Sequence, residues 1–105
     1  MLVKKLPREC FGVVVTTRGI ADEVPSAIIS RLLDRHFDND WGELDEEDAE
    51  LNADAVNACE GRIMSSYAWP ELKERIWIVS YLQSEKKLQQ DMDYCYTTVM
   101  YPSEY

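Results

Sequence analysis

Apolar positions along the chain follow two periods, which predict helices in the first half and strands in the second. The run at 11–17, Phe-Gly-Val-Val-Val-Thr-Thr, is short and rich in β-branched residues, so it predicts a strand that we expect to be buried on both faces. After Pro25, apolar residues recur at steps of three and four up to Phe37. This spacing predicts an amphipathic helix over about 25–37.

A second helix is predicted over about 45–59 from its end signals. Asp45 is a typical N-cap residue, with an acid, Asp48, three positions on, and Gly61 follows as a C-terminal stop. We expect its buried stripe to be Leu44, Leu51, Ala55 and Ala58.

Three further strands are predicted at 62–69, 75–81 and 94–101, the second being central because it is apolar on both sides. The order β-α-α-β-β-β indicates an α+β fold: a small, mostly antiparallel sheet of about four strands with two helices packed on one face. We expect one domain over 1–105, with a mobile N-terminus at 1–10 and a connecting loop or short helix at 82–93.

Composition narrows the class of protein. Apolar residues make up 46% of the chain, which suits a packed core, yet no apolar run approaches the roughly 18 residues of a membrane span. The first ten residues lack the apolar stretch of a secretion signal, and three widely spaced cysteines do not suggest a disulfide scaffold. We therefore expect a cytoplasmic protein in a reducing compartment, with no membrane partner.

Charge is concentrated in one segment. The chain carries a net charge of −9, and residues 38–60 contain ten acids and no Lys or Arg, so the remaining 82 residues sum to +1. This asymmetry is typical of an interaction surface, although a solvated helix face would give the same pattern. Direct nucleic-acid binding is disfavoured because phosphate contacts need clustered cations.

Within that segment, Glu43, Glu47, Glu50 and Asp54 recur at steps of four, three and four. On a helix they would form one row of carboxylates with Cβ atoms about 5–6 Å apart. Such a row could take the place of phosphates on a basic surface. Asp38, Asp40 and Trp41 precede the row, and Trp41 is the aromatic residue that we expect at an interface, although core packing is its other interpretation.

Residues that could carry catalysis or bind metal are few. The Asp38–Gly42 stretch resembles the start of an EF-hand loop, but its glycine would place Phe37 at the first calcium position. Cys10, His36, Cys59 and Cys95 lack the short spacing of zinc ligands. His36, the only histidine, lies four residues after Leu32 on the core-facing stripe. We therefore expect no catalytic residues, no metal and no cofactor.

Several stretches of the chain are distinctive: Val15–Ile20, Asp40–Asp48 (Asp-Trp-Gly-Glu-Leu-Asp-Glu-Glu-Asp) with Asn52, Gly61–Tyr67, Ile76–Val79 and the ending Thr97–Tyr105 (Thr-Thr-Val-Met-Tyr-Pro-Ser-Glu-Tyr). Together they resemble a family of small proteins encoded on bacterial plasmids, phages and other mobile elements. The longer connection over 81–94 departs from the family's pattern. The resemblance implies cargo of a mobile element and brings no catalytic residues to this chain.

These features together predict a non-catalytic acidic inhibitor of a host nucleic-acid-targeting defence, of anti-CRISPR or anti-restriction type. The expected partner is a host protein with a basic surface, such as a nuclease or a guide-RNA complex, in the cytoplasm of a bacterial host. The partner-binding residues would be Asp38, Asp40, Trp41, Glu43, Glu47, Glu50 and Asp54. The alternatives are a regulatory or immunity module that binds a cognate protein through its sheet edge or the 82–93 loop, and a small hydrolase that uses His36.

Overall fold

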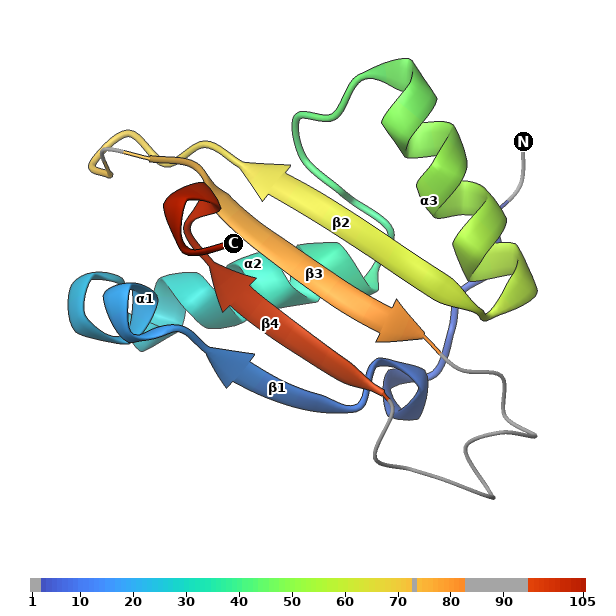
Figure 1. The fold of residues 1–105 in the computed structure, drawn as a ribbon, viewed down its shortest axis with the longest axis horizontal. Helices are drawn as coiled ribbons and strands as arrows, with labels where there is room; N and C mark the ends of the chain where they lie inside the picture. The colour runs from blue at the N-terminus through green and yellow to red at the C-terminus, as the bar shows by residue number, and fades with distance from the viewer. Residues whose placement is uncertain (1–2, 73, 83–94) are drawn as a thin grey trace.

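The computed structural model describes residues 3–72, 74–82 and 95–105, and it has an α+β fold (Figure 1). Its strands are β1 (Val13–Thr16), β2 (Gly61–Tyr67), β3 (Ile76–Leu82) and β4 (Tyr96–Met100). They form one sheet in the order β1-β4-β3-β2, so β3 is central, as predicted.

The sheet is mixed and not antiparallel throughout. β2 and β4 both run antiparallel to β3, whereas β1 runs parallel to β4. A parallel pair requires a long crossover, and the chain between β1 and β4 contains the three described α-helices and two strands.

The two predicted helices are confirmed as α2 (Ser26–Phe37) and α3 (Glu46–Ala58). A short helix, α1 (Arg18–Glu23), was not predicted, because Arg18 and Gly19 indicated only the end of the first strand. Single 3-10 turns, η1 (Arg8–Phe11) and η3 (Pro102–Glu104), lie near the two ends of the chain.

Both main helices pack on the same face of the sheet. Leu32 of α2 joins a cluster with Ile78 of β3, and Val56 of α3 joins a second cluster with Leu82 of β3. Ile78 and Leu82 are four residues apart on one strand, so they point to the same side. α2 crosses behind the sheet, while α3 lies along its β2 edge (Figure 1).

The expectation that the first strand is buried on both faces was wrong. All four residues of β1 are exposed, because β1 is the outermost strand and no element covers its free edge within the described residues. A run of valines looks the same in a sequence whether it lies at the centre of a sheet or at its edge.

The described part of the N-terminal segment completes the second cluster. Leu6, Cys10 and Phe11 are buried there, and the Lys4 amide donates to the side-chain oxygen of Asn57 at 3.1 Å. Of the predicted connection over 82–93, residues 83–93 lie outside the described residues.

Candidate functional site

The acidic segment folds as α3 and the loop before it. The carboxylate of Asp45 caps the helix by accepting from the Asp48 amide at 2.8 Å, and acids in the first turn suit the positive end of the helix dipole. Five carboxylates of α3 are exposed and make no ion pair with any described residue: Glu46, Glu47, Asp48, Glu50 and Asp54. We call Glu47, Glu50 and Asp54, which share one side of the helix, the acidic ridge.

The carboxylates before α3 do not extend this ridge, which corrects the expected row of four. Glu43 precedes the helix, and its carboxylate contacts the Arg75 guanidinium at 2.7 Å. Asp38 is paired with Lys5 at 2.9 Å. These bases lie far away in sequence, so the pairing could not be seen in the charge count of the segment.

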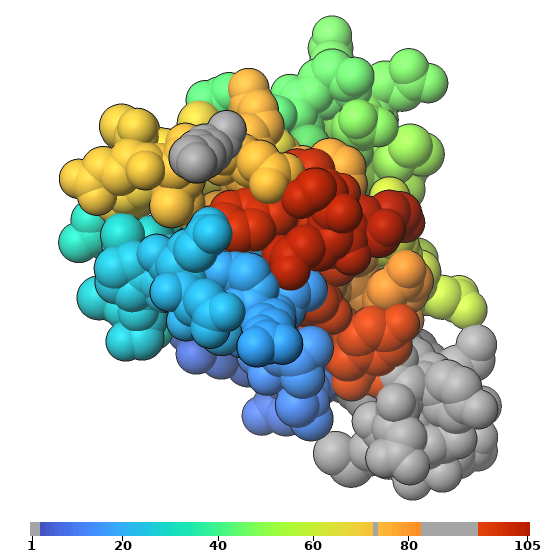
Figure 2. Space-filling view, turned by 60° about the vertical axis from the view of Figure 1, so that its left-hand side comes forward, coloured from blue at the N-terminus to red at the C-terminus, as the bar shows by residue number. Residues whose placement is uncertain are grey.

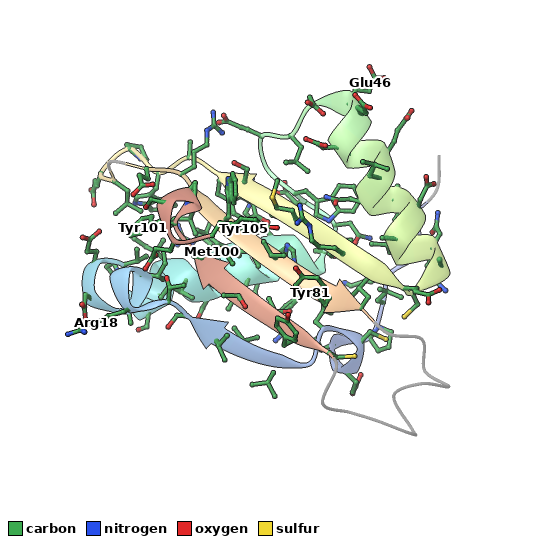
Figure 3. All side chains as sticks on the ribbon, in the orientation of Figure 1. Arg18, Glu46, Tyr81, Met100, Tyr101 and Tyr105 are labelled. Carbon is green, nitrogen blue, oxygen red and sulfur yellow. The ribbon has the colours of Figure 1, made fainter. Side chains whose placement is uncertain are left out.

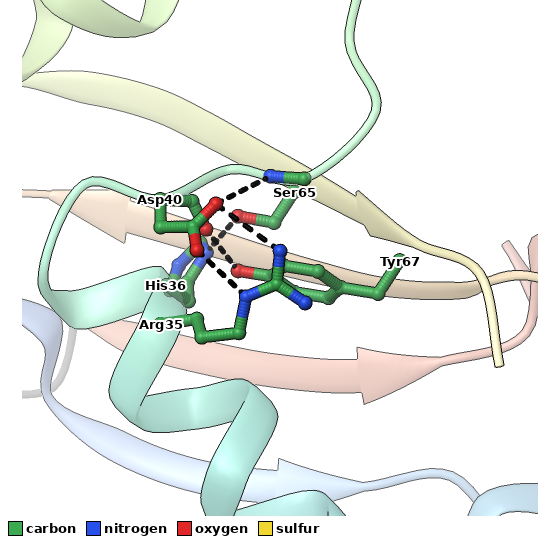
Figure 4. Close-up of polar contacts among 6 residues, drawn as sticks. Arg35, His36, Asp40, Ser65 and Tyr67 are labelled. Carbon is green, nitrogen blue, oxygen red and sulfur yellow. Dashed lines mark hydrogen bonds and ion pairs between the residues drawn. The ribbon is translucent and has the colours of Figure 1, made fainter.

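Asp40 has a structural role at the end of α2 (Figure 4). Arg35 donates two hydrogen bonds to its carboxylate, at 2.7 and 3.2 Å, and this pairing lowers the pKa of Asp40. The same guanidinium lies 4.6 Å from the ring centre of Tyr67, whose hydroxyl donates to the Asp40 carbonyl at 2.6 Å. Asp40 therefore fixes the loop to the sheet and is not available to a partner as a free charge.

Trp41 is half-buried and packs against the second core cluster, so it is not an exposed anchor beside the ridge. Its carbonyl accepts from the Ser66 amide at 3.0 Å, and the Glu43 amide donates to the Ser66 carbonyl at 2.8 Å. This segment thus pairs with the outer edge of β2.

α3 completes the cover of that edge. The side-chain amide of Asn52 donates to the Met64 carbonyl at 2.7 Å and accepts from the Met64 amide at 3.1 Å. Asn52, Ala53 and Val56 are the buried residues of α3, whereas Leu51 is 61% exposed. Of the predicted stripe, Ala55 packs against the second core cluster, but Leu51 and Ala58 are exposed and Leu44 precedes the helix. The buried face was misjudged because hydrophobicity alone does not identify an asparagine that satisfies a strand edge.

The only histidine is fully buried, as its position on α2 predicted. Thr97 donates to the Phe11 carbonyl at 2.9 Å, so it accepts from Ser80 at 2.6 Å. Ser80 then accepts from His36 Nε2 at 2.8 Å, which leaves Nδ1 to accept from Ser65 at 2.5 Å. The ring is neutral, since burial lowers the pKa of His36 to about 3.

Ser65 and His36 contain the atoms of a nucleophile and a base, but no substrate could reach them. Both side chains have no exposed surface and lie between α2 and the sheet. A nucleophile must contact its substrate, so this pair supports the fold and not a reaction.

Metal ligands do not assemble either. Within the described ranges, no group of three or more His, Cys, Asp and Glu side chains is placed to hold a metal ion. The Sγ atoms of Cys10 and Cys59 lie 3.5 Å apart, but His36 is bonded to two serines and forms no cluster with them.

Two of the stretches that carry the family resemblance, Val15–Ile20 and Thr97–Tyr105, contact each other in the fold. The Glu104 carboxylate accepts from the Thr17 hydroxyl at 2.6 Å and from the Gly19 amide at 3.1 Å. The hydrogen bond from Thr17 lowers the pKa of Glu104. The C-terminal motif thus holds the start of α1 in place.

The face of the sheet opposite α2 carries aromatic side chains (Figure 3). The rings of Trp77 and Tyr105 lie 5.8 Å apart, and those of Tyr81 and Tyr96 lie 4.9 Å apart. Alternating apolar residues at 77, 79 and 81 indicate a two-sided strand, but this pattern does not show which face of the sheet the helices leave open.

No family model, no curated protein and no solved structure matches the chain. Among the described residues, no helix has both the length and the apolar character needed to cross a membrane.

Proposed function

We propose that the protein is a non-catalytic inhibitor of a host nucleic-acid-targeting defence, of anti-CRISPR or anti-restriction type. It acts in the cytoplasm of a bacterial host by occupying a basic, nucleic-acid-binding surface of a nuclease or guide-RNA complex. The observation that carries the proposal is the acidic ridge, an anchored helix whose exposed carboxylates have no ion-pair partner among the described residues.

The rigidity of α3 supports this role. Asn52 and Val56 hold one side of the helix against β2, so the opposite side keeps a fixed orientation. From Glu47 to Asp54 the ridge spans about 10 Å at a rise of about 1.5 Å per residue. It therefore presents three charges at a spacing of a few ångströms, comparable to that of phosphates along one strand.

The charge balance supports a cationic target. Residues 38–60 carry all of the chain's excess negative charge, and ion pairs with described bases are made by Asp38, Asp40 and Glu43, none of which belongs to the ridge. A field of one sign accelerates association with a surface of the opposite sign, and salt weakens that effect. The identity of the target class rests on the resemblance to mobile-element cargo.

The sealed environment of His36 and Ser65 supports a non-catalytic role. Inhibition would then depend on binding alone. The fraction of target inhibited should therefore rise with the amount of inhibitor bound, and one inhibitor molecule should not inactivate many target molecules.

The test is co-purification of partners from a bacterial lysate at low and high salt, followed by mass spectrometry. The informative variant combines Glu47→Gln, Glu50→Gln and Asp54→Asn. A matched control combines Glu9→Gln, Asp22→Asn and Glu71→Gln, which removes the same net charge from exposed positions outside the ridge.

We expect a nuclease or guide complex to co-purify at low salt with the wild type and with the control, and to be lost with the ridge variant. Equal recovery with both triple variants would show that the ridge does not bind the target. Recovery of a partner without a basic surface would contradict the proposed mechanism as a whole.

A further inference from the structure

The free edge of the sheet is apolar and uncharged. Val13, Val14 and Val15 are 69%, 38% and 47% exposed, and Thr16 beside them is exposed as well. Proteins commonly protect such an edge with a lysine, a proline or a bulge, and β1 has none of these. In Figure 2 the blue side chains of this segment lie on the molecular surface, beside the orange-red β4.

At the opposite edge of the same sheet, the outward backbone groups of two β2 residues are hydrogen-bonded within the chain. The outward amide and carbonyl of Met64 are bound by Asn52, and those of Ser66 are bound by Glu43 and Trp41. The fold therefore satisfies one edge within the chain and leaves the other unpaired within the described residues. This contrast points to a partner strand for β1 outside the described residues.

The parallel ladder fixes which backbone groups of β1 point outward. The Thr17 amide donates to the Val99 carbonyl at 3.0 Å, and Thr16 is in register with Val99. By alternation, Val13, Val15 and Thr17 bond to β4, whereas the amides and carbonyls of Val14 and Thr16 point away from the sheet. Those four groups make a short template for one more antiparallel strand.

We propose that β1 pairs antiparallel with β1 of a second copy of this chain, around a two-fold axis at Val15. In this register Val14 lies opposite Thr16 of the second copy, so all four outward groups of each strand are bonded. Val15 lies opposite its own copy in a non-hydrogen-bonded pair, where side chains approach most closely. The four-stranded sheets join into one sheet of eight strands.

Pairing at the β1 edge keeps the like charges of two copies far apart. Each copy has a net charge of −9, so self-association must keep the acidic segments apart. β1 contains no charged residue, and α3 lies at the other end of the strand order (Figure 1). Across the joined sheet, the two β2 strands would be separated by seven strand-to-strand spacings, or about 34 Å. That separation is several times the Debye length of about 8 Å at physiological salt.

This pairing is independent of the proposed function, and it has a consequence for binding. A two-fold axis perpendicular to the sheet would place one acidic ridge at each end of the eight-stranded sheet. The particle would thus be bivalent, with both ridges accessible.

The first test is the mass of the protein in solution, measured by sedimentation over micromolar to near-millimolar concentrations. Val15→Lys places two ammonium groups against each other at the axis and should give a monomer, while the wild type forms a dimer. Leu51→Lys is the matched control, since it adds the same charge to an exposed aliphatic position at the far edge, and it should remain a dimer. Val14→Pro removes an outward amide and should also give a monomer. This second variant keeps the test valid if Val15→Lys fails to fold.

The second test fixes the register by mild oxidation of single cysteine variants. Val15→Cys should cross-link to its own copy, because opposite Cα atoms in such a pair are about 4.5 Å apart, within reach of a disulfide. Val13→Cys is more exposed but would lie about 14 Å along the strand from its own copy, so it should cross-link much less. The natural cysteines, Cys10, Cys59 and Cys95, are buried, and oxidation of the wild type measures how much cross-linking they contribute.

A wild type that stays monomeric at the highest concentration would overturn the proposal. Association that survives Val15→Lys and Val14→Pro, or that is lost only with Leu51→Lys, would overturn it as well. A monomer that instead captures an extended peptide at β1 would assign the edge to a cognate partner. Stronger cross-linking at position 13 than at 15 would contradict the register.

Discussion

His36 should make the fold sensitive to mild acid. Its ring is fully buried between Ser65 and Ser80, and burial lowers its pKa to about 3, against an ordinary value of about 6.5. Above pH 6.5 the ring is neutral in both the folded and the unfolded state, so it adds no pH dependence. Below that pH the unfolded chain binds a proton that the folded chain does not, and stability falls as the pH falls.

The size of this effect follows from the pKa difference. Each pH unit between about 6.5 and 3 should cost about 1.4 kcal/mol of unfolding free energy, so the loss between pH 6.5 and 5 is about 2 kcal/mol. That window lies above the ordinary pKa values of Asp and Glu, so carboxylates contribute little to the slope. The lowered pKa values of Asp40 and Glu104 add their own loss only at lower pH.

The assay is urea unfolding followed by tryptophan fluorescence at several pH values from about 7 to 5. His36→Asn is the informative variant: it should be less stable at neutral pH, because two buried serines lose a partner, but its stability should not depend on pH in this window. An equal slope in the wild type and the variant would refute the assignment to His36. A flat wild-type profile would show that the ring is not buried in a neutral form.

Three further predictions concern contacts that stabilise the fold. Asn52→Ala should lower the unfolding free energy by about 2–3 kcal/mol in urea titrations, because the Met64 amide and carbonyl both lose their partner, while Asp54→Ala on the exposed side should change it by less than about 0.5 kcal/mol. Glu104→Ala should lower the melting temperature more than Glu71→Ala does, since only Glu104 binds Thr17 and Gly19; equal shifts would contradict a structural role for the C-terminal motif. Gly12→Ala should prevent folding, as judged by circular dichroism, because its Cβ would lie 2.0 Å from the Cys95 carbonyl oxygen. Gly61→Ala meets nothing within 4 Å, so it should fold and lose only about 1–3 kcal/mol from the strain of an alanine at a φ of 95°.

Helices and strands in which apolar residues recur at a regular spacing were predictable from the sequence. The three- and four-residue steps in α2 correctly placed His36 in the core, and the two-sided pattern of β3 correctly made it central. The capping carboxylate of Asp45 and the stop near Gly61 gave the ends of α3 to within a residue or two. These features depend on neighbours within one or two turns, which the sequence displays directly.

Features that depend on distant neighbours were not predictable. Arg75 is far from Glu43 in sequence, so the neutralisation of the first carboxylate of the expected row appears only in the fold. The buried face of α3 was misjudged because Asn52 is polar by any scale, yet it is buried where it bonds to a strand edge. The valines of β1 were misplaced because burial at a sheet edge depends on what covers the edge and not on the strand itself.

The central claim is that the acidic ridge binds a cationic surface, and the affinity for the co-purified partner as a function of salt tests it most directly. Dissociation constants would be measured for the wild type, for the Glu47→Gln, Glu50→Gln, Asp54→Asn variant and for the matched control outside the ridge. We predict that salt weakens binding of the wild type and the control alike, and that the ridge variant binds more weakly with a shallower salt dependence. Identical affinities and salt slopes for all three proteins would contradict the account.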